Sequence, residues 1–168
     1  MKYSTTDTKS LPNLAGVLAR QWLARDLHQS RWLPMRYVAV KVNTNNYASK
    51  EAAETELRIT RHITEANPQH IGHNFVCTLL DSFDLHRPCG THVCMVFDPL
   101  REPLWMSKQR FQGNVLPLDV VRGVSKMILE GHHYLHSQCH IIHTDLKSDN
   151  ILMALRDQGA LDTVAQDE

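Results

Sequence analysis

The alternation of apolar and polar residues predicts strands in the first half of the chain. Residues 37–42 (YVAVKV) place three valines on one face and predict a strand with one packed face. Residues 51–64 repeat apolar residues at helical spacing and predict a helix that ends before Asn67-Pro68. Two further strand-like runs, 75–83 and 91–97, are separated by a turn with Pro and Gly and are expected to form a hairpin. The expected apolar stripe of the helix contains Ala52, Ala53, Ile59 and Ile63.

The second half of the chain has mainly helical patterning. Residues 98–103 contain two prolines, which lack the backbone donor that a strand needs, so this segment is expected to connect two lobes. Apolar residues at helical spacing predict a long helix from Leu118 to about Ser137. A polar loop, 143–150, and a short apolar run, 151–155, follow it. Strands first and helices second predict an α+β chain.

The composition narrows the range of functions. The 168 residues contain 18 Lys+Arg and 18 Asp+Glu, so no surplus of positive charge favours direct binding to nucleic acid or to an anionic membrane. No apolar run is long enough for a membrane span, and the first residues lack the apolar core of a secretory signal. The 4 cysteines are expected to be reduced. We therefore expect the protein in the cytoplasm or the nucleus.

The loop 143–150 (HTDLKSDN) is the most specific chemical signal. It fits the catalytic-loop pattern of protein kinases, H-R-D-L-x-x-x-N, except that Thr144 stands at the arginine position. In that chemistry Asp145 accepts the proton of a substrate hydroxyl and Asn150 holds a Mg²⁺ ion. Lys147 lies between them as a positive charge for the transferred phosphoryl group. The alternative is a polar loop that contains these residues by chance.

A second signal comes from the predicted strand and the helix after it. Ala39 and Lys41 share one strand face, as the kinase pattern V-A-I-K requires for a small residue under the base and a lysine at the phosphates. Glu56 lies on the apolar stripe of the helix, where a buried carboxylate needs a partner. Lys41 is the candidate partner. The alternative is that Glu56 is solvated at the rim of the stripe and Lys41 extends into solvent.

These motifs carry a resemblance to a known family. From about Leu14 to Leu155 the chain resembles the amino-terminal lobe and the start of the carboxy-terminal lobe of a eukaryotic protein kinase. It is most similar to the SR-protein-specific kinases, in their fungal branch, through residues 22–26 (WLARD), 90–97 (GTHVCMVF) and 143–145 (HTD). The resemblance implies a protein-kinase-like α+β fold, with a five-stranded antiparallel amino-terminal lobe, one helix and an incomplete helical carboxy-terminal lobe. The implied activity is phosphorylation of serine in Arg/Ser-rich proteins of RNA processing, with ATP and Mg²⁺.

The resemblance also implies roles for individual residues. Lys41 and Glu56 would form the ion pair that anchors the phosphates, and Phe97 would be the gatekeeper behind the adenine pocket. Asp98 and Leu100 would offer backbone groups to adenine.

The same resemblance assigns the catalytic groups and the phosphate loop. Asp145 would be the catalytic base and Asn150 a magnesium ligand. The glycine-rich loop of the family corresponds to residues 14–21, where only Gly16 stands at a glycine position. The side chain of Leu14 would hinder the approach of backbone N–H groups to the phosphates.

The predicted organisation has four parts. A tail, 1–11, precedes the amino-terminal lobe, 12–98; the hinge and the start of the second lobe span 99–155, and a family insert spans 156–168. The sequence contains no D-F-G, which supplies the other Mg²⁺ ligand in kinases, so we expect a truncated product. The helix from Leu118 would then expose apolar surface that a partner could cover.

Two alternatives to an active kinase stay open at this point. The first is a zinc site, because histidines four apart on the long helix lie near a cysteine and a further histidine. No C-x-x-C or H-E-x-x-H spacing supports it. The second is a non-catalytic, pseudokinase-like interaction module or truncated gene product that keeps the fold without the chemistry. The residues of the zinc alternative are His132, His136, Cys139, His140 and His143.

Overall fold

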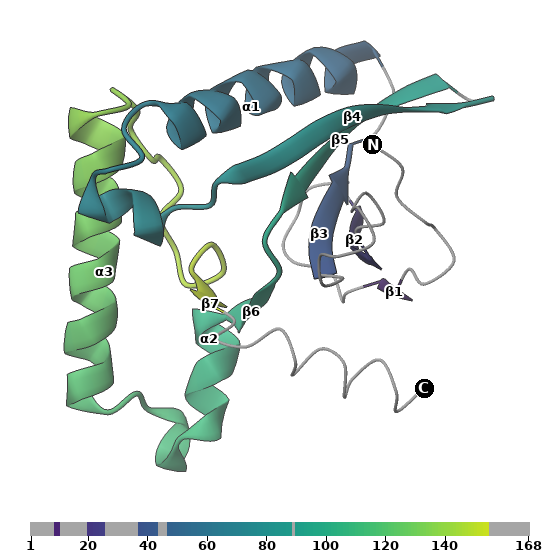
Figure 1. The fold of residues 1–168 in the computed structure, drawn as a ribbon. Helices are drawn as coiled ribbons and strands as arrows, with labels where there is room; N and C mark the ends of the chain where they lie inside the picture. The colour runs from purple at the N-terminus through teal and green to yellow at the C-terminus, as the bar shows by residue number, and fades with distance from the viewer. Residues whose placement is uncertain (1–8, 11–19, 26–36, 44–46, 89, 155–168) are drawn as a thin grey trace, which may run out of the picture. The chain divides into compact units, whose positions relative to one another are not determined.

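The chain forms two compact units. A computed structural model describes residues 9–10, 20–25, 37–43, 47–88 and 90–154, with side chains for 37–43, 50–88 and 90–154 (Figure 1). The first unit comprises Met1–Glu54, Leu80–Arg101 and Ala154–Glu168, and the second comprises Thr55–Leu79 and Glu102–Met153.

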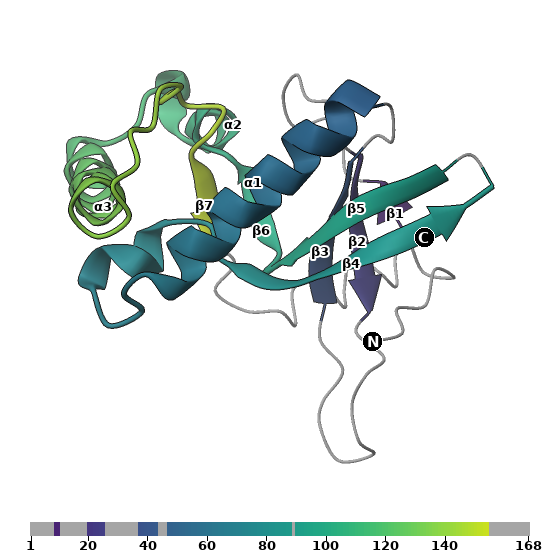
Figure 2. The same cartoon turned by 90° about the horizontal axis from the view of Figure 1, so that it is seen from above.

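A five-stranded sheet forms the first unit, with the order β1-β2-β3-β5-β4 (Figures 1 and 2). Its strands are β1 (Lys9–Ser10), β2 (Arg20–Arg25), β3 (Tyr37–Val42), β4 (Leu79–Arg87) and β5 (Gly90–Phe97). Strand β3 runs antiparallel to β2 and to β5, and Val40 lies opposite Val96. The strand predicted over 37–42 is confirmed, as is the α+β fold with a five-stranded sheet.

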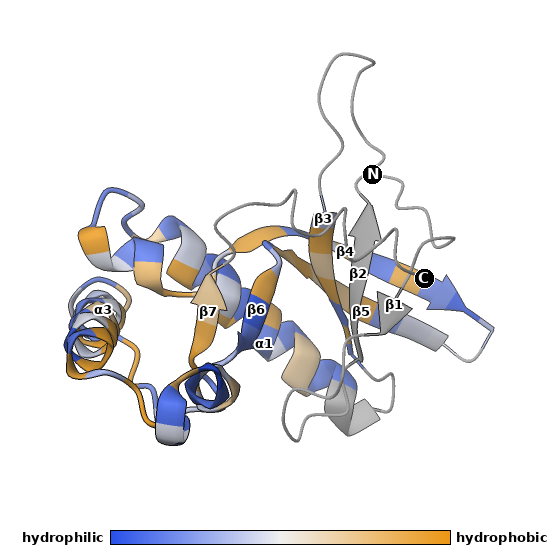
Figure 3. Ribbon diagram, turned by 90° about the horizontal axis from the view of Figure 1, so that it is seen from below, coloured by the Kyte–Doolittle hydropathy of each residue, from blue (hydrophilic) through white to orange (hydrophobic). Residues whose placement is uncertain are grey.

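The core of this unit lies on the valine face of β3. Val38 and Val40 are buried with Cys94 and Val96 of β5, and the apolar residues of β3 appear in orange in Figure 3. Partly buried neighbours pack against this cluster, namely Val42, Leu80, Phe83 and Leu85. Burial, and secondarily the charge of Asp84, raises the pKa of the Cys94 thiol to about 11. Cys94 therefore stays protonated and acts as a small apolar core residue.

The predicted helix over 51–64 is longer than expected, and its covered face includes only part of the predicted apolar stripe. Helix α1 spans Tyr47–Glu65. Ala52 and Ile59 are exposed, so the prediction of their burial is wrong, whereas Ala53 is buried. Thr60 is half-buried, and its hydroxyl donates a hydrogen bond to the Glu56 carbonyl (2.8 Å), so the hydroxyl is not left unpaired.

Two loop expectations are corrected. The run 75–83 is not one strand: Ile71–Phe75 forms the 3-10 helix η1, and β4 begins only at Leu79. The segment 98–103 is not entirely a connector, because Leu100–Pro103 forms strand β6, which pairs with β7 (Leu152–Ala154). The two prolines of this segment stand just before β6 and at its last position, where a missing donor costs little.

The second unit is built on helix α3, which spans Leu118–Ser137 as predicted. Its core contains Tyr134, Leu135 and Cys139. The Tyr134 hydroxyl donates a hydrogen bond to the Ile63 carbonyl at the end of α1. The partly buried apolar neighbours of this core are Ile63, Val76 and Ile141. Between β6 and α3 lie three short helices, namely α2 (Leu104–Ser107), η2 (Lys108–Arg110) and η3 (Gln112–Asn114).

Helix α3 also carries apolar side chains in solvent. Leu118, Val121 and Leu129 are 62%, 41% and 69% exposed. This exposure agrees with the expectation of an uncovered helix, and a partner on this face stays a prediction. Within the described residues, no helix combines the length and the apolar character needed to cross a membrane.

A close backbone contact joins η1 to α3. A Cβ atom added to Gly72 would lie 2.1 Å from the backbone oxygen of Glu130 and 2.7 Å from Cβ of Tyr134. On the other side of the contact, a Cβ atom added to Gly131 would lie 3.1 Å from the carbonyl oxygen of Phe75. Glycine is therefore required at residue 72 for the two elements to meet.

Replacement of Gly72 by alanine is expected to lower the free energy of unfolding by about 1–3 kcal/mol, because the added methyl group forces η1 away from α3. Gly123→Ala is the matched control, because nothing lies within 4 Å of its added Cβ atom. Alanine at this helical position is expected to stabilise by about 0.5–1 kcal/mol. Urea denaturation of the purified chains measures both effects. Equal stability of Gly72→Ala and the parent would contradict the contact.

Candidate active site

The end of α3 directs the chain into the predicted catalytic loop. The amide of Gln138 donates to the Tyr134 carbonyl (3.0 Å), and the amide of Ile141 donates to the Leu135 carbonyl (2.8 Å). Between them His140 adopts a positive φ of 56°, a conformation that is uncommon outside glycine but more frequent for histidine, asparagine and aspartate. The helix thus ends in a tight reversal that leads the chain from the buried Cys139 towards Asp145.

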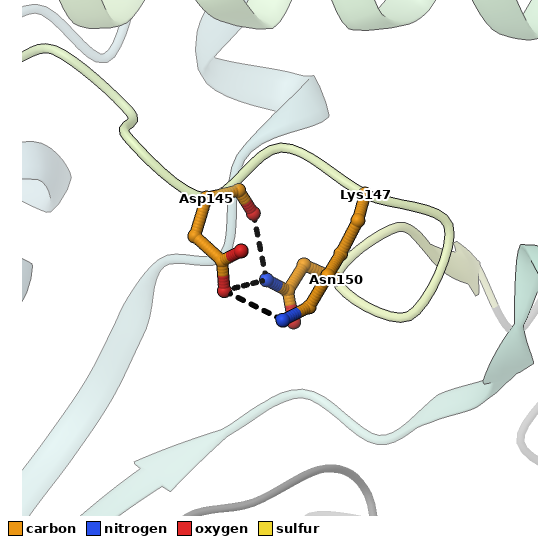
Figure 4. A network of polar contacts seen from close by, with 3 residues as sticks. All are labelled: Asp145, Lys147 and Asn150. Atoms are coloured by element: carbon orange, nitrogen blue, oxygen red, sulfur yellow. Dashed lines mark hydrogen bonds and ion pairs between the residues drawn. The ribbon is translucent and has the colours of Figure 1, made fainter.

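Three predicted site residues meet in this loop, as Figure 4 shows. The Asp145 Oδ2 atom lies 2.9 Å from the Lys147 Nζ atom and accepts a hydrogen bond from Asn150 Nδ2 at 3.0 Å. Asn150 Nδ2 also donates to the backbone oxygen of Asp145 (2.8 Å), and the Asn150 amide donates to the Lys147 carbonyl (3.0 Å). The loop therefore closes on itself and fixes the three side chains relative to one another.

Asp145 and Lys147 each favour the charged form of the other. The hydrogen bond from Lys147, and then the one from Asn150, lowers the pKa of Asp145 below its ordinary value. The same contact with Asp145 raises the pKa of Lys147. Asp145 is thus a carboxylate and Lys147 an ammonium at neutral pH. Their side chains are 65% and 47% exposed, so both can reach a bound substrate.

The free oxygen of Asn150 fits a magnesium ligand. Its Nδ2 atom makes both hydrogen bonds to Asp145, and no described residue donates a hydrogen bond to its Oδ1 atom. Amide oxygens are among the hard ligands that Mg²⁺ accepts. Asp145 holds the amide in this orientation, so Oδ1 is available for a cation.

The predicted adenine and phosphate residues of the first unit lie on neighbouring strands. Ala39 is buried on β3 directly opposite Phe97 of β5, and the half-buried Lys41 lies opposite Met95. Residues opposite each other in an antiparallel pair share a face. Ala39, Lys41 and Phe97 therefore lie on one face of the sheet. Asp98 follows this strand and is exposed.

The other predicted site residues lie on different elements of the chain. Leu100 is half-buried at the start of β6. Glu56 lies on α1 in the second unit and is partly buried, whereas Lys41 belongs to the first unit. The ion pair between Lys41 and Glu56 therefore stays a prediction. Gly16 lies outside the described residues.

Histidine rings lie close to one another near the catalytic loop, in edge-on and tilted arrangements. The His132 ring centroid lies 5.8 Å from those of His136 and His143. In the part of the chain that the structure describes, no group of three or more His, Cys, Asp or Glu side chains is placed to hold a metal ion. The zinc alternative is therefore without support from this geometry.

The buried hydrogen-bonded tyrosine near the end of α3 was not predicted from the sequence. Tyr134 is fully buried, and its hydroxyl accepts a hydrogen bond from the amide of Asn67 (3.4 Å). The side chain of Asn67 donates to Gln138 Oε1 (2.8 Å) at the end of α3. The Asn67-Pro68 helix stop is the one signal that could have pointed to this contact.

Comparisons with known proteins give consistent matches. The family model described as the protein kinase domain matches residues 33–161. The serine/threonine-protein kinase SKY1 of Saccharomyces cerevisiae is 34% identical over 145 residues, which are 84% of this chain and 19% of that protein. The protein kinase dsk1 of Schizosaccharomyces pombe is 37% identical over 87% of this chain and 26% of its own length. SRSF protein kinase 3 of Mus musculus is 33% identical over 84% of this chain and 24% of its own length.

A solved structure has a similar fold. The crystal structure of the kinase domain PF14_0431 gives a TM-score of 0.71 at 24% identity, and the match covers 90% of this chain and 39% of that one. This likeness agrees with the α+β fold predicted from the sequence. The chain spans about a fifth to a quarter of the length of the curated relatives named above.

Lys147→Ala is expected to raise the pKa of Asp145 towards the ordinary aspartate value, because the ammonium that favours the carboxylate is removed. The Asp145 carboxylate of the variant is therefore protonated at a higher pH than that of the parent. An NMR titration of the Asp145 carboxyl carbon between about pH 2 and 6 measures the shift. Lys126→Ala is the control, since Lys126 is an exposed residue of α3 and makes no hydrogen bond to Asp145. Unchanged titration in Lys147→Ala would contradict the ion pair.

Proposed function

Because this chain belongs to the protein kinase family, we propose that it carries the ATP-binding lobe and catalytic loop of a serine/threonine kinase acting on Arg/Ser-rich proteins. The cluster of Asp145, Lys147 and Asn150 is the observation that carries the proposal. The relatives confirm the predicted resemblance to SR-protein kinases, with fungal members among them. The name of one relative, SRSF protein kinase 3, supports the proposed substrate class.

Asp145 is the proposed proton acceptor. Its lowered pKa keeps the carboxylate ionised at neutral pH, and its exposure leaves room for a serine hydroxyl. As the serine oxygen forms its bond to the γ-phosphorus, the hydroxyl proton passes to Asp145 and the bond from this phosphorus to the bridging oxygen of ATP breaks. ADP leaves with the bridging oxygen and its electron pair.

Lys147 and Asn150 are proposed to handle the charge of the phosphates. The raised pKa of Lys147 keeps its ammonium group charged beside the transferred phosphoryl group. Asn150 would hold a Mg²⁺ ion through Oδ1. When bound, Mg²⁺ neutralises the phosphate charge.

The first unit is proposed to hold the nucleotide. Ala39 leaves space for the flat base on the sheet face that it shares with Lys41 and Phe97. Lys41 would bind the α- and β-phosphates, and the backbone of Asp98 and Leu100 would meet the adenine edge. Glu56 and Gly16 keep the roles that the resemblance implies.

Cytoplasm and nucleus are the proposed locations, because Arg/Ser-rich proteins of RNA processing are the proposed substrates. The exposed apolar side chains of α3 support a further protein contact there.

Phosphate transfer tests the catalytic assignment. The full chain is incubated with Mg²⁺, radiolabelled ATP and an Arg/Ser-repeat peptide, and Asp145→Asn is expected to reduce transfer by about 10²- to 10⁴-fold. Asp119→Asn is the control, because Asp119 is an exposed residue at the start of α3 whose ion pair is with Arg122. Transfer that survives in Asp145→Asn would refute the role of this carboxylate.

Nucleotide binding separates a kinase lobe from an interaction module. ATP with Mg²⁺ is expected to raise the unfolding temperature of the parent, since a ligand that binds only the folded state stabilises it. Lys41→Met is expected to lose this rise, whereas the exposed Lys50→Met should keep it. Equal unfolding of the parent with and without nucleotide, together with absent transfer, would favour the non-catalytic alternative.

A further inference from the structure

A histidine caps the short helix that packs on α3. His70 is the N-cap residue of η1, with φ −73° and ψ 134°, and its Nδ1 atom accepts a hydrogen bond from the amide of Gly72 at 3.0 Å. A backbone N–H can only donate. Nδ1 must therefore carry a lone pair, and the ring is the neutral imidazole with its proton on Nε2.

This cap lies directly beside the close contact between η1 and α3. Gly72 is the residue whose backbone meets the Glu130 carbonyl of α3, with no room for a side chain. The turn is also fixed behind the cap, because a ring nitrogen of His73 lies 3.1 Å from the Thr64 carbonyl of α1. Loss of the bond from Gly72 to His70 would release the segment that places Gly72 against α3.

The surroundings of His70 contain further histidine and no acidic partner. From α3, the His133 ring centroid lies 5.1 Å from that of His70 and the Tyr134 ring centroid 5.5 Å. The ring centroid of His73 in η1 lies 5.5 Å from that of Tyr134, and the two rings are nearly perpendicular. Glu130 approaches this turn through its backbone oxygen, and within the described residues no carboxylate forms an ion pair with His70.

We propose that His70 and His133 form an acid-sensitive latch between η1 and α3. Protonation of His70 removes the lone pair that accepts the Gly72 bond, because both nitrogens of an imidazolium are donors. It also places a positive charge beside the His133 ring, whose centroid lies 5.1 Å away. The bond from Gly72 needs the neutral imidazole, so the latch is closed when His70 is neutral and opens when acid protonates the ring.

The latch affects the catalytic loop because α3, the helix that it holds, leads directly into that loop. Tyr134, against which both His70 and His73 pack, is the buried anchor at the end of that helix. Acidification would loosen the support of this helix without changing any residue of the loop. The proposal concerns stability and does not depend on phosphoryl transfer.

The central test compares His70→Asn with the parent in urea denaturation at pH 7.5 and 5.5. The asparagine side-chain oxygen can accept the same bond from the amide two residues on and cannot be protonated. Between pH 7.5 and 5.5 the folding equilibrium constant of the parent is expected to fall about fivefold more than that of His70→Asn. This factor corresponds to the usual stabilisation by a helix cap. His86→Asn, which changes an exposed histidine of the first unit, should keep the parental loss. An equal loss in the parent and His70→Asn would overturn the proposal.

Two local measurements on the parent chain test the bond between Gly72 and His70 without a variant. Nitrogen-15 NMR of the imidazole rings at pH 7.5 is expected to show the Nε2–H form for His70, and an Nδ1–H form would overturn the latch. Hydrogen exchange of the Gly72 amide, corrected for its intrinsic rate, is expected to be about fivefold less protected at pH 5.5. Unchanged protection of this amide would also refute the proposal.

Discussion

The second unit depends on the contact between the backbone of Gly72 and the carbonyl of Glu130. This approach is closer than any side chain permits, so η1 can lie directly on α3. It brings the end of α1 within reach of the Tyr134 hydroxyl, which is fully buried and hydrogen-bonded there. A buried hydroxyl without a partner would cost about 1–3 kcal/mol, so the packing and the hydrogen bond require each other. The catalytic loop begins from the helix held in this way.

The elements with a strong periodic pattern could be predicted from the sequence. Strand β3 and helix α3 bury one face over several repeats, and both were found at their predicted bounds. Helix η1 could not be predicted, because it is placed by one glycine in contact with a distant helix and has no period of its own. Strand β6 was also missed, because its partner β7 lies far along the chain and its prolines argue against a strand until that pairing is known.

Some features of the site could also be predicted from a local sequence pattern, and others could not. Asp145, Lys147 and Asn150 lie in one short loop, so their meeting follows from a local motif. The position of Ala39 opposite Phe97 needed the register of β3 on β5, which the sequence does not state. The cap at His70 depends on which nitrogen of a ring holds the proton, and no pattern of residue types contains that information.

The pairing of β3 with β5 also limits how this gene can change in length. Lys41 lies opposite Met95, and its neighbour Val40 lies in the core opposite Val96. A codon inserted or deleted within β3 would shift the register by one residue and exchange the two faces. The lysine would enter the core and a valine would take its place on the opposite face. In-frame insertions and deletions within this strand should therefore be removed by selection.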